Sequence, residues 1–536
     1  MSVIWFKGER EICSAVSDWL DDRDRPGTLF RDNPRRQVVC AQTLVGPLLI
    51  KLFKKTGKRN GFKEHVKALL RLEAASREFS SLDRMWKSNA SIAPRPLALG
   101  RTNQNEGVLV STFYQGHPLT EALMEKDCDR VALLSKVGKT IGAFHLAGMI
   151  HRDLHAENIL VTPSNVLIVD LQSTIMLSRH LKTPNFSRTR DLGALNYSLW
   201  RHTTEDERRV LVNASILEES KALGSRSQKE AFLTTWGKKI EKSAWRHFHR
   251  HARSRTKKAK SAGRRFSIAS WKNLTGLKKQ SLLQRDLEKI LELHSESIYA
   301  RDHNVIKDDQ RSKITRIHLD QQTYVIKETS CRNIARGFTD NLRGSAARRA
   351  WRAAYGLEAR NIRAPEAFAF VEERVVGIIR RSILILGELN EIISPLDLSQ
   401  VDPQSCLNLV TESIMELHRK GVDHGDLKVT NYVFSGELGK PTQAIPVDLE
   451  QVKFHRKVAY SRRVEALAQL NASLPDSVDN KSREKAFETY CRIMPFRTNA
   501  DPKVNHQAKS KIVSLSLKKQ HRWTGRGCSL SSRQLR

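Results

Sequence analysis

The chain carries one polar pattern twice, and its residue types suit phosphoryl transfer. In each copy an aspartate is followed five residues later by an asparagine, and a second aspartate ends an apolar run further on. The copies are Asp153, Asn158 and Asp170 in the first half and Asp426, Asn431 and Asp448 in the second. Phosphoryl transfer needs a metal-bound nucleotide, a positioned acceptor hydroxyl and stabilisation of charge, rather than covalent help. The pattern predicts those parts at two sites.

The first aspartate of each copy is placed to orient the acceptor hydroxyl and to accept its proton. The catalytic candidates are therefore Asp153 and Asp426. The asparagine side-chain oxygen and the strand-end carboxylate suit a magnesium ion that bridges the phosphates of ATP. The candidate metal ligands are Asn158, Asp170, Asn431 and Asp448. The expected cofactors are thus ATP and Mg²⁺.

A lysine ends an apolar strand pattern upstream in each half: Lys51 after residues 48–50 and Lys327 after residues 324–326. Each lysine is expected to contact the α- and β-phosphates of the nucleotide. Glu78, in the helical stretch that follows Lys51, is its expected partner. The matching segment of the second half, residues 346–352, has no acidic residue, so the sequence does not identify the partner of Lys327.

The two halves repeat each other around these loops. Residues 144–158 and 417–431 align without a gap over fifteen positions. A helical apolar pattern precedes each loop, over residues 131–144 in the first half, and Gly148 and Gly421 follow where a helix C-terminal glycine belongs. A spaced match of this length indicates duplicated domains.

The order of elements is typical of the two-lobed kinase plan: strand with lysine, helix, extended run, loop and hairpin. We expect an α+β chain of two tandem bilobal protein-kinase-like domains. Each has an N-lobe antiparallel sheet plus helix and a mostly helical C-lobe. The predicted segments are a first domain at 1–245, a basic linker or helix at 246–280, a second domain at 281–500 and a basic C-terminal tail at 501–536.

Some expected kinase features are missing from the sequence. Neither half has a clear glycine-rich phosphate loop, and in the second half backbone amides, Ser312 or Thr315 are the expected substitutes. The Ala-Pro-Glu segment of eukaryotic-type protein kinases is also missing, which favours a small-molecule or glycolipid acceptor. The loop histidines His151 and His424 are expected to pack beneath the loops rather than to act as acids or bases.

The composition points to an anionic partner. The formal net charge is +34, which favours a nucleic acid, an anionic membrane face or a phosphorylated sugar or lipid. The seven cysteines have no CxxC spacing, which favours a reducing cytosol over a disulfide framework or a zinc site. No apolar run reaches the ~18 residues of a spanning helix, and the charged first ten residues do not suit a secretory signal.

The second half resembles the lipopolysaccharide kinase (Kdo/WaaP) family. The resemblance rests on residues 324–327, 344–351, 362–367, 424–431, 447–450 and 466–475, and the first half is similar through 93–97, 151–158, 169–172 and 190–195. It implies ATP- and Mg²⁺-dependent phosphorylation of a Kdo or heptose sugar of the lipopolysaccharide inner core. It also implies action in the cytoplasm, peripherally at the cytoplasmic face of the inner membrane, on an anionic glycolipid and not on nucleic acid.

Two other interpretations stay open. One is an atypical protein Ser/Thr/Tyr kinase, which the His-Arg-Asp form of the first loop supports. The other is a partly degenerate, kinase-like scaffold that binds an anionic membrane or nucleic acid through the basic stretch 246–265. A degenerate second domain is also open, because Lys327 lacks an identified glutamate partner.

Overall fold

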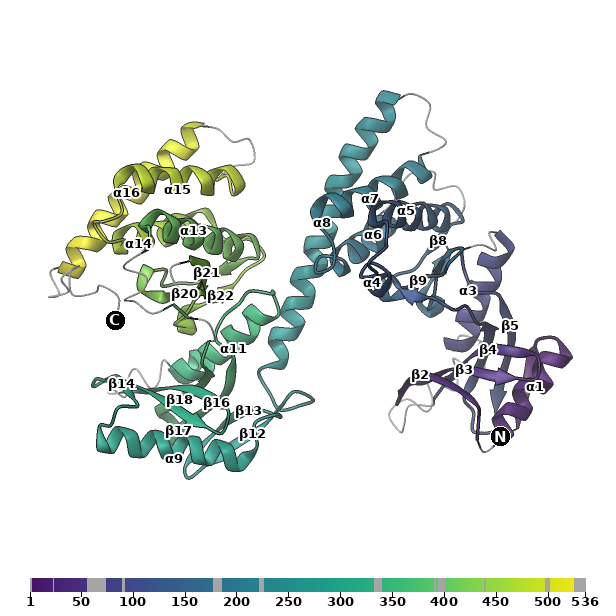
Figure 1. Ribbon diagram of the computed structural model, residues 1–536, viewed down its shortest axis with the longest axis horizontal. Helices are drawn as coiled ribbons and strands as arrows, with labels where there is room; N and C mark the ends of the chain where they lie inside the picture. The colour runs from purple at the N-terminus through teal and green to yellow at the C-terminus, as the bar shows by residue number, and fades with distance from the viewer. Residues whose placement is uncertain are drawn as a thin grey trace. The chain divides into compact units, whose positions relative to one another are not determined.

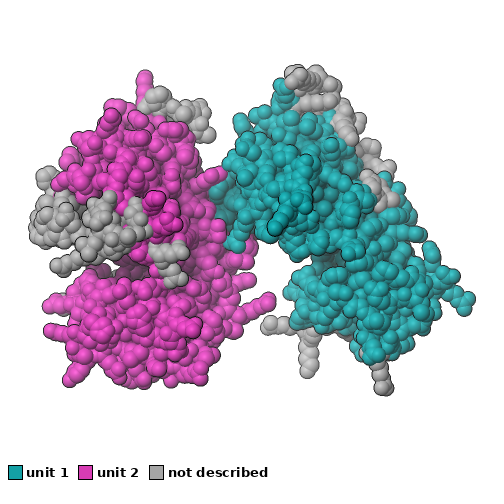
Figure 2. Space-filling model, in the orientation of Figure 1, with its two compact units in different colours: residues 1–248 teal, residues 249–536 magenta. Residues whose placement is uncertain are grey.

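The computed structural model describes residues 2–22, 24–54, 74–88, 92–176, 186–220, 226–331, 340–389, 392–393, 401–437, 440–496 and 502–524. The chain divides into two compact units, Met1–Phe248 and His249–Arg536, which Figure 2 colours separately. The division falls inside helix α8 (Arg226–Lys258). In each unit a sheet-rich lobe is followed by a helical lobe (Figure 1), so the predicted fold class is confirmed.

The first unit begins with a six-stranded sheet in the order β1-β5-β6-β4-β3-β2. Its strands are β1 (Val3–Lys7), β2 (Gly27–Asn33), β3 (Arg36–Thr43), β4 (Gly46–Phe53), β5 (Pro96–Thr102) and β6 (Gly107–Thr112). Helix α1 (Arg10–Asp21) packs on one face, in a cluster that contains Ile50 and Leu52 of β4. Helix α3 (Ala74–Ser88) packs in a separate cluster with Leu109. Because successive strand residues face opposite sides, Lys51 lies on the side of α3.

The helical lobe of the first unit holds the loop between short strands. Its helices are α4 (Leu119–Ala122), α5 (Arg130–Leu146), α6 (Phe186–Ser198), α7 (Glu205–Glu219) and the first part of α8. The short elements are β7 (His117–Pro118), β8 (Met149–Ile150), η1 (Ala156–Asn158), β9 (Ile159–Val161), β10 (Val166–Ile168), η2 (Leu171–Ser173) and β11 (Ile175–Met176). The predicted helix is α5, but Val131 in its first turn is 54% exposed and does not join the core. Gly148 has φ +80°, as a helix C-terminal glycine requires.

The second unit repeats this plan with one more strand. Its sheet has the order β12-β13-β17-β18-β16-β15-β14. The strands are β12 (Phe266–Trp271), β13 (Leu274–Lys279), β14 (Val305–Asp308), β15 (Ser312–Leu319), β16 (Gln322–Ser330), β17 (Ala367–Val375) and β18 (Ile378–Gly387). Helix α9 (Gln284–Ala300) packs on the sheet through Leu287, Ile290 and Leu291, as α1 does in the first unit. Helix α11 (Ala346–Glu358) takes the place of α3.

The helical lobe of the second unit contains α13 (Pro403–Arg419), α14 (Tyr460–Ser473), α15 (Asn480–Ile493) and α16 (Pro502–Thr524). Its short elements are β19 (Val422–Asp423), η3 (Val429–Asn431), β20 (Tyr432–Glu437), β21 (Lys440–Pro446), η4 (Leu449–Gln451) and β22 (Lys453–Phe454). Gly421 has φ +74° after α13 and repeats the helix-ending role of Gly148.

Two predicted boundaries differ from the structure. The segment 246–280 is helical to Lys258, and then forms β12 and β13, which are integral strands of the second sheet. The second domain therefore begins before residue 281. Of the predicted basic tail, residues 502–524 form α16, in which Ala508 and Ile512 are buried and Ser516 donates to the Ala468 carbonyl at 3.2 Å. The sequence of each segment is mostly charged, and only a few apolar residues make the packing contacts. Composition alone therefore suggested a linker and a tail.

Replacing Ile512 tests whether α16 belongs to the second domain. Ile512→Ala is expected to lower the free energy of unfolding of the second unit by about 2–4 kcal/mol, because it empties a buried position. Its neighbour Val513 is 45% exposed, so Val513→Ala should change stability by no more than about 0.5 kcal/mol. Urea unfolding of both variants measures this, and equal losses would contradict the packing of α16.

Candidate functional site

In the first unit the predicted lysine and glutamate meet. The Nζ atom of Lys51 lies 2.5 Å from Oε1 of Glu78. Both residues are buried, with Lys51 8% exposed and Glu78 fully enclosed. A buried ammonium needs such a partner, because desolvating an unpaired charge costs several kcal/mol. The pair ties β4 to α3 and fixes the amine on the inner side of the sheet.

In the second unit the lysine is paired from a different element. The Nζ atom of Lys327 lies 2.7 Å from Asp448 Oδ1 and 2.8 Å from Glu450 Oε1. Helix α11 contributes no acid here; instead Arg349 donates through Nε to the backbone carbonyl of Glu450 at 3.2 Å. Glu450 is therefore the lysine partner that sequence reasoning missed. The sequence did contain a sign of this pairing, because the second half has the acidic Glu450 where the first half has the neutral Gln172.

The strand-end aspartate of the first unit is engaged by an arginine that was not predicted. Nη1 and Nη2 of Arg36 each lie 2.8 Å from an oxygen of Asp170. Asp170 is in the left-handed region with φ 63°, and Asp448 repeats this with φ 58°; such backbone in non-glycine residues concentrates at functional sites. Burial alone would raise the pKa of Asp170, but hydrogen bonds from Arg36 and the charge of Lys51 hold it below its usual range.

The catalytic-loop residues lie together as predicted in both units. Asn158 donates through Nδ2 to the backbone carbonyl of Asp153 at 2.9 Å, and Asn431 donates to that of Asp426 at 2.8 Å. Asn431 also lies 3.3 Å from Asp426 Oδ2. Because each asparagine uses its nitrogen on the loop, its side-chain oxygen is left for a cation.

The loop histidines tie the catalytic loops to the strand-end aspartates. His151 and His424 are buried, and each Nε2 lies 3.0 Å from a backbone carbonyl, that of Val169 or Val447. These valines directly precede Asp170 and Asp448. The predicted packing of these histidines beneath the loops is confirmed.

A buried carboxylate anchors the backbone of each loop, but from a different place in each unit. Asp191 of α6 accepts the amides of His151 at 2.6 Å and Arg152 at 2.9 Å. In the second unit Asp423, immediately before the loop, accepts the amide of Gly425 at 3.1 Å. Arg152 and Gly425 both have positive φ, at 67° and 79°, a conformation that is strained for the arginine but ordinary for the glycine. Sequence reasoning assigned no role to either aspartate.

Lys428 is a further group that sequence reasoning missed. Its Nζ lies 3.1 Å from Asp426 Oδ1, two residues away. The first unit has His155 at this position. A lysine beside the candidate catalytic aspartate would supply positive charge where an acceptor and a phosphate would meet.

The hairpins that stand in for glycine-rich loops use their own side chains to hold the backbone amides. Asn33 Oδ1 accepts the amides of Arg35 and Arg36, both at 2.9 Å, and Asp309 Oδ1 accepts those of Arg311 and Ser312 at 2.8 and 2.7 Å. These four amides are therefore already hydrogen-bonded within the hairpins and are not available to bind a phosphate. The expectation for Thr315 is wrong: it is fully buried and bonded to His294 Nδ1 at 2.7 Å.

The oxygen donors of the second unit fit a magnesium ion better than those of the first. No cluster of three or more His, Cys, Asp or Glu that would hold a metal by itself occurs among the described residues. Mg²⁺ is commonly held by one or two side-chain oxygens together with nucleotide phosphates, which Asn431 and the 41% exposed carboxylate of Asp448 can provide. In the first unit both oxygens of Asp170 are already taken by Arg36, so that donor set does not fit the ion.

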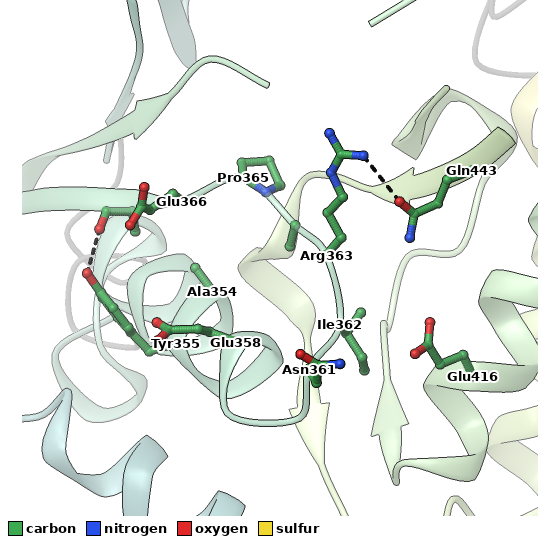
Figure 3. A pocket seen from close by; sticks show the side chains of 12 residues that line it. Ala354, Tyr355, Glu358, Asn361, Ile362, Arg363, Pro365, Glu366, Glu416 and Gln443 are labelled. Atoms are coloured by element: carbon green, nitrogen blue, oxygen red, sulfur yellow. Dashed lines mark hydrogen bonds between the residues drawn. The ribbon is translucent and has the colours of Figure 1, made fainter. Parts of the chain in front are cut away.

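A separate hollow of about 480 Å³ lies in the second unit between α11, the segment leading to β17, α13 and β21 (Figure 3). None of the candidate site residues lines it. Two of its polar side chains have protein partners: Tyr355 donates to the Ala367 carbonyl at 2.6 Å, and Arg363 donates to Gln443 at 3.3 Å. The hollow is therefore distinct from the candidate site.

The comparisons with known proteins agree with this geometry. The model of the lipopolysaccharide kinase (Kdo/WaaP) family matches residues 25–214 and again residues 307–490, which together make up more than half of the chain. The chain belongs to this family, in tandem duplicate. It is accordingly a kinase of the lipopolysaccharide-kinase type. Members of the family are phosphotransferases, and each match spans one lysine strand and one catalytic loop.

A solved structure, WaaP in complex with acyl carrier protein, is similar to this chain with 17% identity and a TM-score of 0.30. The alignment covers 44% of this chain and 96% of that one. No curated protein matches the chain.

The loop of the first unit rests on a buried charged network. His145 lies 3.0 Å from Glu219 through Nδ1 and 3.6 Å from Asp191 through Nε2, and Arg188 contacts Glu219 at 3.1 Å. Burial alone would lower the pKa of His145, but the neighbouring carboxylates of Asp191 and Glu219 outweigh it and raise the pKa to about 9. The protonated imidazole therefore contributes its full stabilisation of the fold at pH values below the pKa of the unfolded state, 6.5. This stabilisation is lost as the pH rises through about 9, the pKa in the folded state.

A pH series on His145 tests this network. Between pH 6.5 and 9 the native state holds a proton that the unfolded chain lacks, so stability should fall by about 1.4 kcal/mol per pH unit at most. Urea unfolding of the parent and of His145→Gln measures the difference. The variant should lack this part of the slope, and an identical pH dependence in both proteins would rule out a charged His145.

Replacing Glu450 tests the unusual lysine partner. Glu450→Gln is expected to weaken ATP binding at the second site about 10-fold, because a charged hydrogen bond that positions Lys327 is lost. Calorimetric titration with ATP and Mg²⁺, in a chain whose first site carries Lys51→Ala, measures this affinity. The exposed Glu437→Gln is the matched control, and unchanged affinity in Glu450→Gln would contradict the pairing.

Proposed function

We propose that the chain transfers the γ-phosphoryl group of ATP to a sugar, Kdo or heptose, of the lipopolysaccharide inner core. The observation that supports this is that the lysine, the strand-end aspartate and the loop residues of the second unit are connected by direct contacts. The chain in which they occur belongs to the lipopolysaccharide kinase family. There Lys327 contacts Asp448, while Asn431 and Lys428 contact Asp426. The amide of Val447 donates to the Asn431 carbonyl at 2.9 Å and joins the two groups.

The proposed roles follow from the chemistry of these groups. Asp426 orients the acceptor hydroxyl and accepts its proton, as Asp153 would in the first unit. Asn431 and Asp448 supply the side-chain oxygens for a magnesium ion, which when bound neutralises charge on the phosphates. Lys327 contacts the nucleotide phosphates, and Lys428 adds positive charge beside Asp426.

In the first unit the corresponding proposal is that Lys51, held by Glu78, contacts the nucleotide. Asn158 and Asp170 are the equivalents of the metal ligands, but Arg36 occupies Asp170. We therefore assign the transfer step to the second unit. Its lysine has acidic partners after all, so a missing helix glutamate does not make this domain degenerate.

We also place the protein at the cytoplasmic face of the inner membrane, in peripheral contact with anionic lipid. The net charge of +34 supports this, because each basic residue near an anionic surface contributes about 1 kcal/mol of attraction. None of the described helices is both long and apolar enough to cross a bilayer.

A transfer assay on the full chain tests this function. With γ-labelled ATP, Mg²⁺ and purified core glycolipid, the label should pass to the glycolipid. Asp426→Asn should lower the rate at least ~100-fold, because general-base help is lost, whereas Asp153→Asn should keep most of it. Asp476→Asn, at an exposed surface carboxylate, is the matched control.

Each alternative result has a distinct meaning. Label on protein alone would overturn the glycolipid acceptor in favour of a protein kinase. Loss of activity in Asp153→Asn with full activity in Asp426→Asn would move the transfer step to the first unit. Absence of any transfer and of ATP binding would reject the proposed reaction.

A further inference from the structure

We propose that the nucleotide site of the first unit binds ATP without Mg²⁺, with the guanidinium of Arg36 serving at Asp170 in place of the metal ion. This rests on the proposed nucleotide binding by Lys51. It assigns Arg36 as a ligand-binding residue and gives the two units different cofactor requirements.

The contact itself disfavours a metal on Asp170. Arg36 meets both carboxylate oxygens, each at 2.8 Å, and the two side chains are only 12% and 16% exposed. Parallel N–H···O bonds of this kind are the strongest arrangement between these groups. A Mg²⁺ ion requires near-octahedral oxygen ligands at short distance, and it would have to displace a like charge to reach Asp170.

Arg36 is held in this position by the strand, not by a loose loop. It begins β3, where it pairs with Phe53 of β4, and its amide is bonded to Asn33 at 2.9 Å. Two residues further along β3, Val38 pairs with Lys51. Residues two apart lie on the same face of a strand, so Arg36 and Lys51 both face the side where the nucleotide would bind.

The remaining donors of Arg36 suit a phosphate. A guanidinium carries five N–H groups, and only two are used on Asp170. The others can hold a phosphate oxygen while the bond to Asp170 persists, so one group bridges carboxylate and phosphate as a metal does. With Lys51 this places two basic side chains at the site.

The second unit provides an internal comparison. Ser312 stands fifteen residues before Lys327, as Arg36 stands fifteen before Lys51. No arginine contacts Asp448 among the described residues; its partner there is Lys327. The carboxylate of Asp448 is 41% exposed, against 16% for Asp170. The second unit is therefore expected to need Mg²⁺.

Photolabelling of the full chain separates the two sites. The protein is irradiated with 8-azido-ATP in excess EDTA or in excess Mg²⁺, and labelled peptides are assigned to residues 1–248 or 249–536 by mass spectrometry. Labelling of the first unit should change less than ~3-fold between the two conditions. Labelling of the second unit should fall more than ~10-fold in EDTA.

Variants at two adjacent arginines give the matched control. Arg36→Ala should make labelling of residues 1–248 depend on Mg²⁺ by at least ~10-fold, while Arg35→Ala, an exposed neighbour that does not contact Asp170, should behave as the parent. Arg36→Lys keeps the charge without the two-pronged contact and should be intermediate. Circular dichroism and thermal unfolding establish that each variant is folded.

The outcomes are distinguishable from failure of the proposed reaction. Mg²⁺-dependent labelling of the first unit in the parent, or EDTA-resistant labelling that persists in Arg36→Ala, would overturn the role of Arg36. No labelling of residues 1–248 in either condition would also overturn it, and labelling of residues 249–536 would still report on the proposed kinase site.

Discussion

The lysine on the sheet, buried in the first unit and half-buried in the second, is the constraint on which each unit depends. An ammonium removed from water must have a carboxylate beside it, because the desolvation cost otherwise exceeds what the fold can absorb. In the first unit Glu78 meets this need from α3. In the second Glu450 and Asp448 meet it from the end of the catalytic hairpin. The choice of partner then sets the charge balance of the whole site.

The carboxylates that hold the loop backbone also come from different elements in the two units. The left-handed backbone after each loop histidine is held by a buried carboxylate, which in the first unit is Asp191, from a helix further along the chain. The second supplies Asp423 from the adjacent strand. The duplicated domains have therefore kept the positions of the charges while moving the residues that carry them.

The sequence predicted what depends on spacing along the chain. The two loops, the lysine strands, the Lys51–Glu78 pair and the glycines after α5 and α13 follow from order and periodicity. It did not predict Glu450 as a lysine partner or Arg36 on Asp170, because those contacts join segments 120 residues or more apart through side-chain packing. Nor did charge composition reveal α16, whose burial rests on a few small and apolar residues.

The two unpredicted contacts are connected. In the first unit Lys51 is committed to Glu78, so Asp170 needs another cation, and Arg36 provides it. In the second unit the glutamate sits at Glu450, next to Asp448, so one lysine serves both carboxylates, and the serine at the equivalent of Arg36 is sufficient. The position of the glutamate thus goes together with the partner of the strand-end aspartate, which is a guanidinium in the first unit and the sheet lysine in the second. This tandem kinase has the glutamate on the helix in the first unit, as Glu78, and beside the strand-end aspartate in the second, as Glu450. One chain therefore contains both ways of pairing the sheet lysine.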